Sequence, residues 1–213
     1  MQTQAFVSIG RNCATGSLLQ TARLRTESLA FDWARSTLAS VRDVLVRGVD
    51  WHLRQIERPG YAVEYVHHSL EDMSYFRSCT LRLFSTVENA DELHLVCCTP
   101  GPVDIGEVVA VRDAAIAVRD AARCEPESLG ARDVSAHVLH GYAGPPYGVR
   151  GIVRSERRAP GVFVVDVAAD KAFQTNFMRG PFYEQLARDV FPFADKGRIY
   201  HSGIQGKGSC GER

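Results

Sequence analysis

The stretch Ala5-Phe6-Val7-Ser8-Ile9-Gly10-Arg11-Asn12-Cys13 near the start of the chain decides how the fold begins. Its first five residues are mostly apolar, which predicts a short buried strand over Ala5–Ile9 that ends at Gly10. Apolar residues then recur at helical spacing, which predicts a helix from about Ala14 to Arg23. Cys13 is therefore expected in a strand-to-helix turn.

Strand-like and helix-like segments alternate through the rest of the chain. A second helix is expected after Ser36, whose side chain suits the N-cap position. Met73–Phe84 fits either a helix or a strand, and the arginine-rich stretch Gly144–Pro160 is expected to be irregular. Further strands are predicted at Ala62–His67, Glu92–Cys98, Ala136–His140 and Val162–Val167, and further helices from Ile105 to about Cys124 and from Gly180 onward.

This alternation predicts an α/β fold, with a layered mixed sheet and flanking helices. The turn at Cys13 would lie at the carboxyl edge of the sheet, where folds of this class usually place their sites. With 213 residues, 45% of them hydrophobic, the chain is long enough for one sizeable core. We therefore expect a single catalytic domain over residues 1–200, followed by a flexible C-terminal tail over residues 201–213.

Charge and composition argue against several classes of function. Lys+Arg and Asp+Glu both number 25, so the chain lacks the basic excess of a nucleic-acid-binding protein. It shows no secretory signal segment and no apolar run of the ~20 residues that a transmembrane helix needs. These features predict a cytoplasmic protein that has no membrane partner. The six cysteines are then expected to be reduced thiols.

No metal and no other cofactor is expected. His94, Cys97 and Cys98 are residue types that bind zinc. In a strand, however, His94 and Cys98 share one face while Cys97 lies on the opposite face. The three side chains therefore do not converge on one ion.

Cys13 has the clearest chemical role. A thiol attacks a carbonyl as the thiolate, and the free N–H groups and dipole at a helix N-terminus favour that form. Gly10, Arg11 and Asn12 would shape the turn around an oxyanion site, to which the Asn12 side chain would donate. The alternative interpretation is a small buried cysteine with no reactivity.

A histidine must take the proton from the thiol, and an acid or amide must orient the imidazole ring. His67 and His68 are the first candidates because they lie at the end of a predicted strand. His140, at the end of another strand, is the second candidate. Asp32 and Asp166 are the candidate orienting acids.

Two other classes of function fit the same turn. In an esterase-like α/β hydrolase, Ser8 or Ser36 would be the nucleophile in place of the cysteine. In a non-catalytic binding module, the N-terminus of the helix would hold a phosphate or a glycan.

The residues around this turn also resemble a known family. The pattern consists of Ser8-Ile9-Gly10-Arg11-Asn12-Cys13, then Leu24-Arg25, Ser28, Phe31-Asp32-Trp33 and Ser36. It resembles the opening signature of a family of papain-like cysteine peptidases, known mostly as an uncharacterised domain of bacteria and large DNA viruses. The resemblance is specific over residues 8–36 and looser to about residue 99. Ala30 stands where the family usually carries proline.

The resemblance implies roles for several residues. Cys13 would be the nucleophile, His67 or His68 the base, and Asp32 would belong to the site. Phe31-Asp32-Trp33 would pack beside the Cys13 turn. The implied activity is cysteine-dependent acyl transfer, in which a thioester on the cysteine passes its acyl group to water or to an amine. The substrate would be a peptide, an amide or a small thioester-linked molecule.

Overall fold

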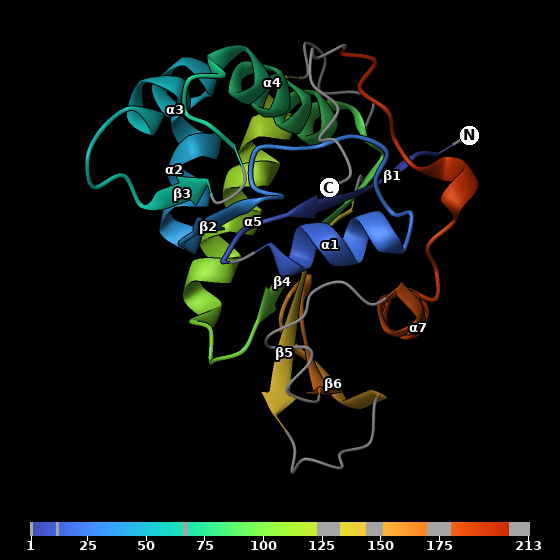
Figure 1. Ribbon diagram of the computed structural model, residues 1–213. Helices are drawn as coiled ribbons and strands as arrows, with labels where there is room; N and C mark the ends of the chain where they lie inside the picture. The colour runs from blue at the N-terminus through green and yellow to red at the C-terminus, as the bar shows by residue number, and fades with distance from the viewer. Residues whose placement is uncertain are drawn as a thin grey trace.

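A five-stranded sheet runs through the centre of the protein in the computed structural model (Figure 1). The structure describes residues 2–11, 13–65, 68–122, 133–143, 151–169 and 180–204. The strand order is β1-β4-β5-β7-β6, in which all neighbours are parallel except the antiparallel pair β6 and β7. The strands are β1 (Gln4–Ser8), β4 (Glu92–Thr99), β5 (Val134–Ala143), β6 (Gly151–Ala159) and β7 (Val162–Ala169).

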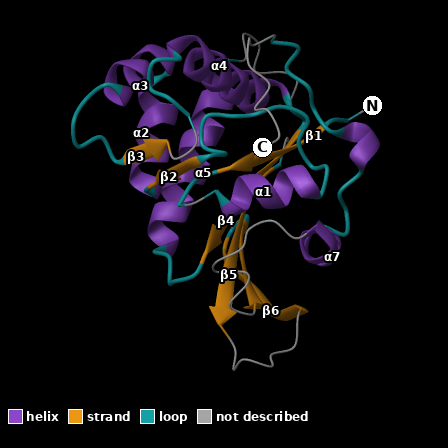
Figure 2. Cartoon of the chain, viewed as in Figure 1, coloured by secondary structure: helices purple, strands orange, loops and turns teal. Residues whose placement is uncertain are grey.

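Helices cover both faces of this sheet, as Figure 2 shows. Helices α1 (Ala14–Thr21) and α7 (Gly180–Val190) pack on one face. The opposite face is covered by α2 (Leu38–Arg47), α4 (Met73–Asn89) and α5 (Ile105–Ala121). The layered α/β fold predicted from the sequence is therefore confirmed. Outside these layers lie α3 (Val49–Ile56), the two-stranded sheet of β2 (Ala34–Ser36) and β3 (Val63–Tyr65), and the short 3-10 helix Lys196–Arg198.

Successive side chains along each strand point to opposite faces of the sheet, which divides the core into two parts. Val7 and Cys97 face α2, α4 and α5, whereas Phe6 and Cys98 face α1 and α7. The prediction that the adjacent cysteines point to opposite faces is confirmed. Among the residues that the structure describes, no group of three or more metal-binding side chains occurs.

Three local predictions were wrong or incomplete. Gly151–Ala159 forms β6, because pairing with the apolar strand β7 supplies the order that its charged sequence does not indicate. The ambiguous segment from Met73 is the helix α4. Ser36 does not cap α2, because it belongs to β2. The N-cap is Thr37, whose side chain accepts from the Ser40 amide at 3.1 Å.

Near its C-terminus the chain returns to β1 and lies beside it. Ile199 forms a parallel bridge with Gln4, and the Tyr200 amide donates to the Gln4 carbonyl at 2.8 Å. We call residues 199–204 the C-terminal strap; residues 205–213 of the predicted tail lie outside the described part of the chain. Within that part, no helix has the length and apolar character needed to cross a membrane.

Candidate active site

The turn between β1 and α1 depends on two unusual backbone conformations. Gly10 and Arg11 have φ angles of +92° and +72°. A Cβ atom on Gly10 would lie 1.8 Å from the Ser36 hydroxyl, so only glycine fits at this position. The Arg11 amide donates to the Ser36 carbonyl at 3.1 Å. Together these contacts reverse the chain so that α1 begins directly after Cys13.

Cys13 occupies the N-cap of α1 and makes no capping hydrogen bond with its side chain. The residue is partly exposed, whereas the other described cysteines are buried. Burial raises the pKa of Cys79 to about 11 and of Cys97 and Cys98 to about 12, which keeps those thiols protonated. Cys13 is thus the one accessible thiol in the described part of the chain.

The first turn of α1 is held against the sheet next to Cys13. The Thr15 hydroxyl accepts from the Cys98 amide at 2.9 Å, and the Ser17 amide makes the first helical bond, to the Cys13 carbonyl at 3.0 Å. The amides of Thr15 and Gly16 precede that bond and therefore have no partner within the helix. N–H groups at this end of a helix can stabilise negative charge.

The predicted oxyanion residues are used partly for structure. The amide of Arg11 is bonded to Ser36, and its guanidinium donates to the Pro102 carbonyl at 3.2 Å. Asn12 lies outside the described residues. Gly10 permits the turn but its own carbonyl faces the Cys97 thiol at 3.9 Å. Among the described residues, the first turn of α1 offers further backbone N–H groups for an oxyanion, and the predicted part of Asn12 stays a prediction.

The Phe31-Asp32-Trp33 loop packs against this turn. The Ser8 hydroxyl donates to the Phe31 carbonyl at 3.4 Å. A Cβ atom on Gly16 would lie 2.2 Å from the Asp32 carbonyl oxygen, so the loop backbone touches α1 at its first turn. The predicted proximity of this loop to Cys13 is confirmed.

Asp32 organises the loop from inside. Its carboxylate is fully buried, forms an ion pair with Arg25 and accepts from the Leu29 amide at 2.6 Å. Burial raises the pKa of Asp32, and the Arg25 guanidinium opposes that shift. These hydrogen bonds go to Arg25 and Leu29 rather than to a described histidine. Asp32 thus holds the backbone of the loop in place. Its predicted role in orienting a histidine ring stays a prediction, because His67 lies outside the described residues.

The first candidate base lies behind the same loop. His68 stacks on Tyr75 with ring centroids 4.2 Å apart. It lines a small aromatic pocket together with Trp33 and Cys79. Trp33 belongs to the loop that touches α1, so one short segment connects this pocket with the Cys13 turn. His67 lies outside the described residues.

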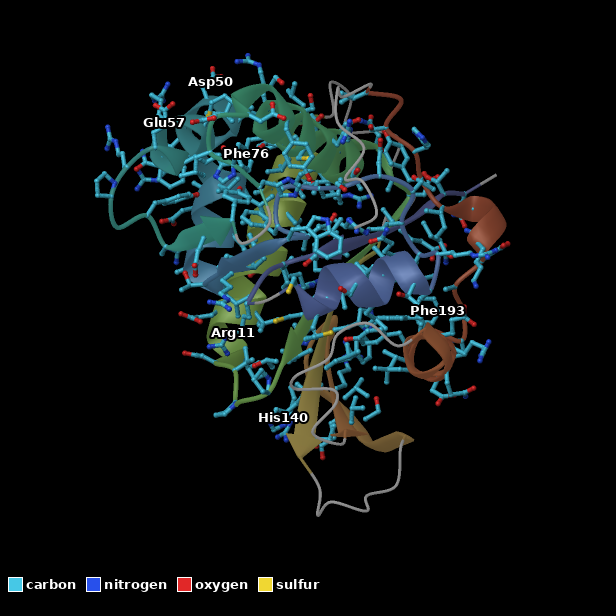
Figure 3. The ribbon with its side chains drawn as sticks, viewed as in Figure 1. Arg11, Asp50, Glu57, Phe76, His140 and Phe193 are labelled. Carbon is cyan, nitrogen blue, oxygen red and sulfur yellow. The ribbon has the colours of Figure 1, made fainter. Side chains whose placement is uncertain are left out.

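The second candidate base, His140, contacts the second candidate acid, Asp166. His140 Nδ1 and Asp166 Oδ1 are 3.1 Å apart at the carboxyl ends of β5 and β7, and both side chains are about one-third exposed. Figure 3 shows His140 near the end of β5. Because side chains alternate along a strand, His140 shares the face of Val138, which α5 covers, whereas Cys13 begins a helix on the opposite face.

Neither predicted serine nucleophile has a histidine partner in the described part of the chain. The Ser8 hydroxyl is fully buried and donates to a backbone carbonyl. The Ser36 hydroxyl is also buried, beside Gly10, with no hydrogen-bond partner among the described residues. A serine esterase mechanism gains no support from this geometry.

Tyr183 lies near Cys13, and the sequence analysis did not identify it as part of the site. It projects from α7 into the core that contains Ala14 and Cys98, and it is almost fully buried. Burial raises the pKa of Tyr183, and the nearby Cys98 and Cys13 thiols raise it further. Its hydroxyl therefore stays protonated beside the Cys13 turn. Only the packing of α7 on α1 brings these residues together.

The comparisons with known proteins agree with this location. Residues 4–90 match the sequence model of a family described as "Putative papain-like cysteine peptidase". The resemblance noted at the turn is thereby confirmed. The match covers less than half of the chain; it contains Cys13, Asp32 and both adjacent histidines and ends before His140. No curated protein and no solved structure shows significant similarity to the chain.

Proposed function

We propose that this protein is a cysteine-dependent acyl-transfer enzyme, a peptidase, an amidase or a relative that forms amide bonds. The observation that carries the proposal is the placement of Cys13: a partly exposed cysteine at the N-cap of a helix, at the carboxyl edge of a mostly parallel sheet. The family match over residues 4–90 supports a thiol as the nucleophile.

The reaction begins with transfer of the Cys13 proton to a histidine. The thiolate attacks the carbonyl carbon of an amide or thioester, and the carbonyl oxygen becomes an oxyanion that the amides of Thr15 and Gly16 stabilise. The histidine then returns its proton to the leaving amine or thiol, which leaves an acyl thioester on Cys13. Water or a second amine attacks this thioester and releases the acid or a new amide.

The base in this proposal is His67 or His68. Both fall within the family match, and His68 shares a pocket with Trp33 of the loop beside α1. His140 is the alternative base, favoured by its contact with Asp166, which would hold the ring in one orientation. His140 lies on the face of the sheet opposite α1, so we place it second.

Asp32 supports the base indirectly in this scheme. Its buried ion pair with Arg25 and its bond to the Leu29 amide fix the loop that separates α1 from the His68 pocket. A fixed loop holds the thiol and the imidazole at a constant separation, which nucleophilic catalysis requires.

Selective alkylation tests the nucleophile. Iodoacetamide is added at pH 7 to the protein and to the variants Cys13→Ala and Cys97→Ala, and labelling is read at each cysteine by mass spectrometry. We expect rapid labelling at Cys13 and no loss of that labelling in the matched control Cys97→Ala, whose thiol is buried. Hydrolysis of a panel of simple acyl thioesters should disappear in Cys13→Ala. Full activity in a folded Cys13→Ala variant would end the proposal.

The variants His67→Gln, His68→Gln and His140→Gln identify the base. Loss of the true base should reduce thioester hydrolysis by a factor of about 10² or more and change its pH dependence. The other two variants should retain most of the activity. If only His140→Gln loses activity, the base is His140 and the assignment to the segment at residues 67–68 is wrong.

A further inference from the structure

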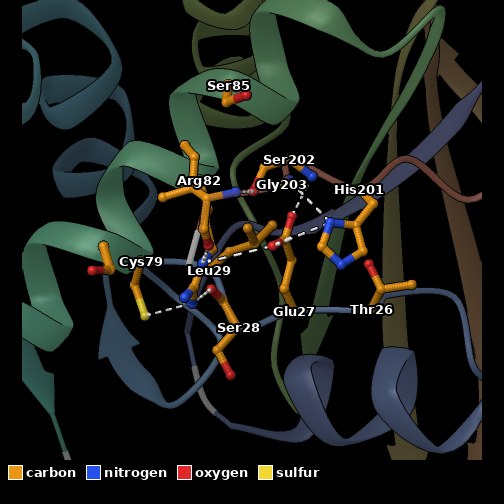
Figure 4. Close-up of polar contacts among 12 residues, drawn as sticks. Thr26, Glu27, Ser28, Leu29, Cys79, Arg82, Ser85, His201, Ser202 and Gly203 are labelled. Carbon is orange, nitrogen blue, oxygen red and sulfur yellow. Dashed lines mark hydrogen bonds and ion pairs between the residues drawn. The ribbon is translucent and has the colours of Figure 1, made fainter. Parts of the chain in front are cut away.

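Arg82 connects the C-terminal strap to the segment that leads into the Phe31-Asp32-Trp33 loop. Its side chain is nearly buried on α4. Nε donates to the Ile204 carbonyl at 3.0 Å, and Nη1 lies 3.4 Å from the Ser28 carbonyl (Figure 4). The same Nη1 lies 4.0 Å from the Cys79 thiol, which lines the His68 pocket. One guanidinium thus contacts the strap, the loop segment and the wall of the pocket.

Glu27 makes the second half of the connection. One carboxylate oxygen accepts from the Ser202 amide at 2.6 Å, and the other lies 3.6 Å from Arg82 Nε and 3.8 Å from the exposed His201 ring. Thr26, the preceding residue, donates to the Tyr200 carbonyl at 3.4 Å. Three consecutive residues of the loop segment are therefore held by the strap or by Arg82.

A series of contacts connects this segment to the Cys13 turn. After Ser28, the Leu29 amide bonds the Asp32 carboxylate, and the Asp32 backbone touches α1 at Gly16. Gly16 lies in the first turn of the helix that Cys13 caps. A displacement of Glu27 or Ser28 would therefore move the loop that borders the thiol.

We propose that Arg82 and Glu27 are positioning residues, through which the C-terminal strap holds the loop beside Cys13 in place. The strap lies outside the residues that match the family, so this contribution comes from the second half of the chain. The assignment rests on the proposed role of Cys13 only for its effect on reactivity; the coupling of strap and loop stands on the contacts alone.

Hydrogen exchange tests the coupling in the full-length chain. The variant Arg82→Met keeps the aliphatic stem and removes the guanidinium. We expect exchange at the Ser202 amide and at the Leu29 and Asp32 amides to increase together, by about tenfold or more. Arg82→Lys should rescue only part of the protection, because an ammonium cannot reach the separate acceptors as a planar guanidinium does.

A neighbouring arginine provides the control. Arg77 lies on the same helix, is mostly exposed and pairs with Asp50 at 3.9 Å. Arg77→Met should leave all of these amides protected. If strap and loop amides respond independently in Arg82→Met, or only the strap responds, the proposed positioning is wrong.

The rate of Cys13 alkylation by iodoacetamide at pH 7 separates this inference from the proposed function. In Arg82→Met the rate should fall by about tenfold, because a displaced loop no longer holds the base at a constant distance from the thiol, while Arg77→Met should keep the wild-type rate. An unchanged rate in Arg82→Met overturns the effect on the site. A Cys13 that resists alkylation in the wild-type protein would instead refute the proposed function, and the exchange result would still decide the coupling.

Discussion

Acid should destabilise this protein strongly, because three histidines are buried in the neutral form. His52 is fully buried, with its Nδ1 2.7 Å from the Tyr61 hydroxyl and its Nε2 2.8 Å from the Tyr65 hydroxyl. A neutral ring can donate to one hydroxyl and accept from the other, but a protonated ring cannot accept. Burial lowers the pKa of His52 to about 4.

The other two histidines share one serine on the opposite side of the molecule. His94 Nδ1 lies 2.8 Å from the Ser135 hydroxyl and His137 Nε2 lies 2.9 Å from it. Burial lowers the pKa of His94 to about 4 and of His137 to about 3. The His94 ring packs on Phe6 and the His137 ring on Phe191. Glu92 Oε2 lies 3.8 Å from His94 Nε2 and opposes the lowering of the His94 pKa, but burial is the larger effect.

The magnitude follows from the difference between folded and unfolded pKa values. The unfolded chain binds protons below the ordinary histidine value of 6.5, while the folded state resists them until about pH 4 or 3. Stability is therefore lost as pH falls through this window. Each histidine costs about 1.8 kcal/mol between pH 7 and pH 5, or about 5 kcal/mol for three, against total stabilities of about 5–15 kcal/mol.

Urea unfolding at pH 7, 6 and 5, followed by tryptophan fluorescence, measures this loss. The buried Asp32 carboxyl contributes the opposite pH dependence: because its pKa is raised in the folded state, it favours folding as the pH falls. A comparison of His52→Gln with the wild type cancels that contribution. The variant should lose about 1.8 kcal/mol less than the wild type between pH 7 and pH 5. His201→Gln, at an exposed histidine, is the control and should behave like the wild type.

Equal losses in His52→Gln and the wild type would refute the reasoning, since they would show that His52 binds its proton equally well in the folded and unfolded states. A wild-type stability that stays flat from pH 7 to pH 5 would refute it for all three histidines, provided that Asp32→Asn gives the same flat profile.

Three further substitutions test the site. Gly10→Ala should lower the free energy of unfolding by at least about 2 kcal/mol in urea unfolding, because its positive φ and lack of space both exclude a Cβ atom. Arg25→Met should cost about 3–5 kcal/mol by leaving the Asp32 carboxylate buried without its counter-ion. That loss should be smaller at pH 5 than at pH 8, and the double variant with Asp32→Asn should recover part of it; an equal loss at both pH values would contradict a charged partner. Tyr183→Phe should slow the alkylation of Cys13 at pH 7 by about threefold or more if the phenol donates to the thiolate, and an unchanged rate would show that it does not.

The local part of the site was largely predictable. Glycine after an apolar run and helical spacing after Cys13 were sufficient to place the thiol at a strand-to-helix turn, because both signals depend on neighbouring residues only. The packing of Phe31-Asp32-Trp33 beside that turn followed from the family resemblance. Ser36 was mistaken for a helix cap because its role in β2 depends on a distant partner strand, β3.

Contacts between distant segments could be found only in the tertiary structure. The pairing of His140 with Asp166 requires β5 and β7 to be parallel neighbours, and the strand β6 acquires its order from β7. The bonds of Arg82 to Ser28 and to the strap join residues far apart in the chain. A sequence pattern records which faces are apolar but not which elements cover them, so such contacts leave no local signal.

The sequence by itself therefore determined the α/β class and the position of Cys13 at the end of the first strand. The α/β class follows from the alternation of strand and helix patterns along the chain. Short-range sterics, helix periodicity and glycine at a positive φ fix the Cys13 turn within about ten residues. The tertiary structure decided the surroundings of the thiol: the buried Asp32–Arg25 pair, Tyr183 on α7 and the strap that holds the loop. Burial and charge pairing depend on how layers pack, and that packing exists only in the folded chain.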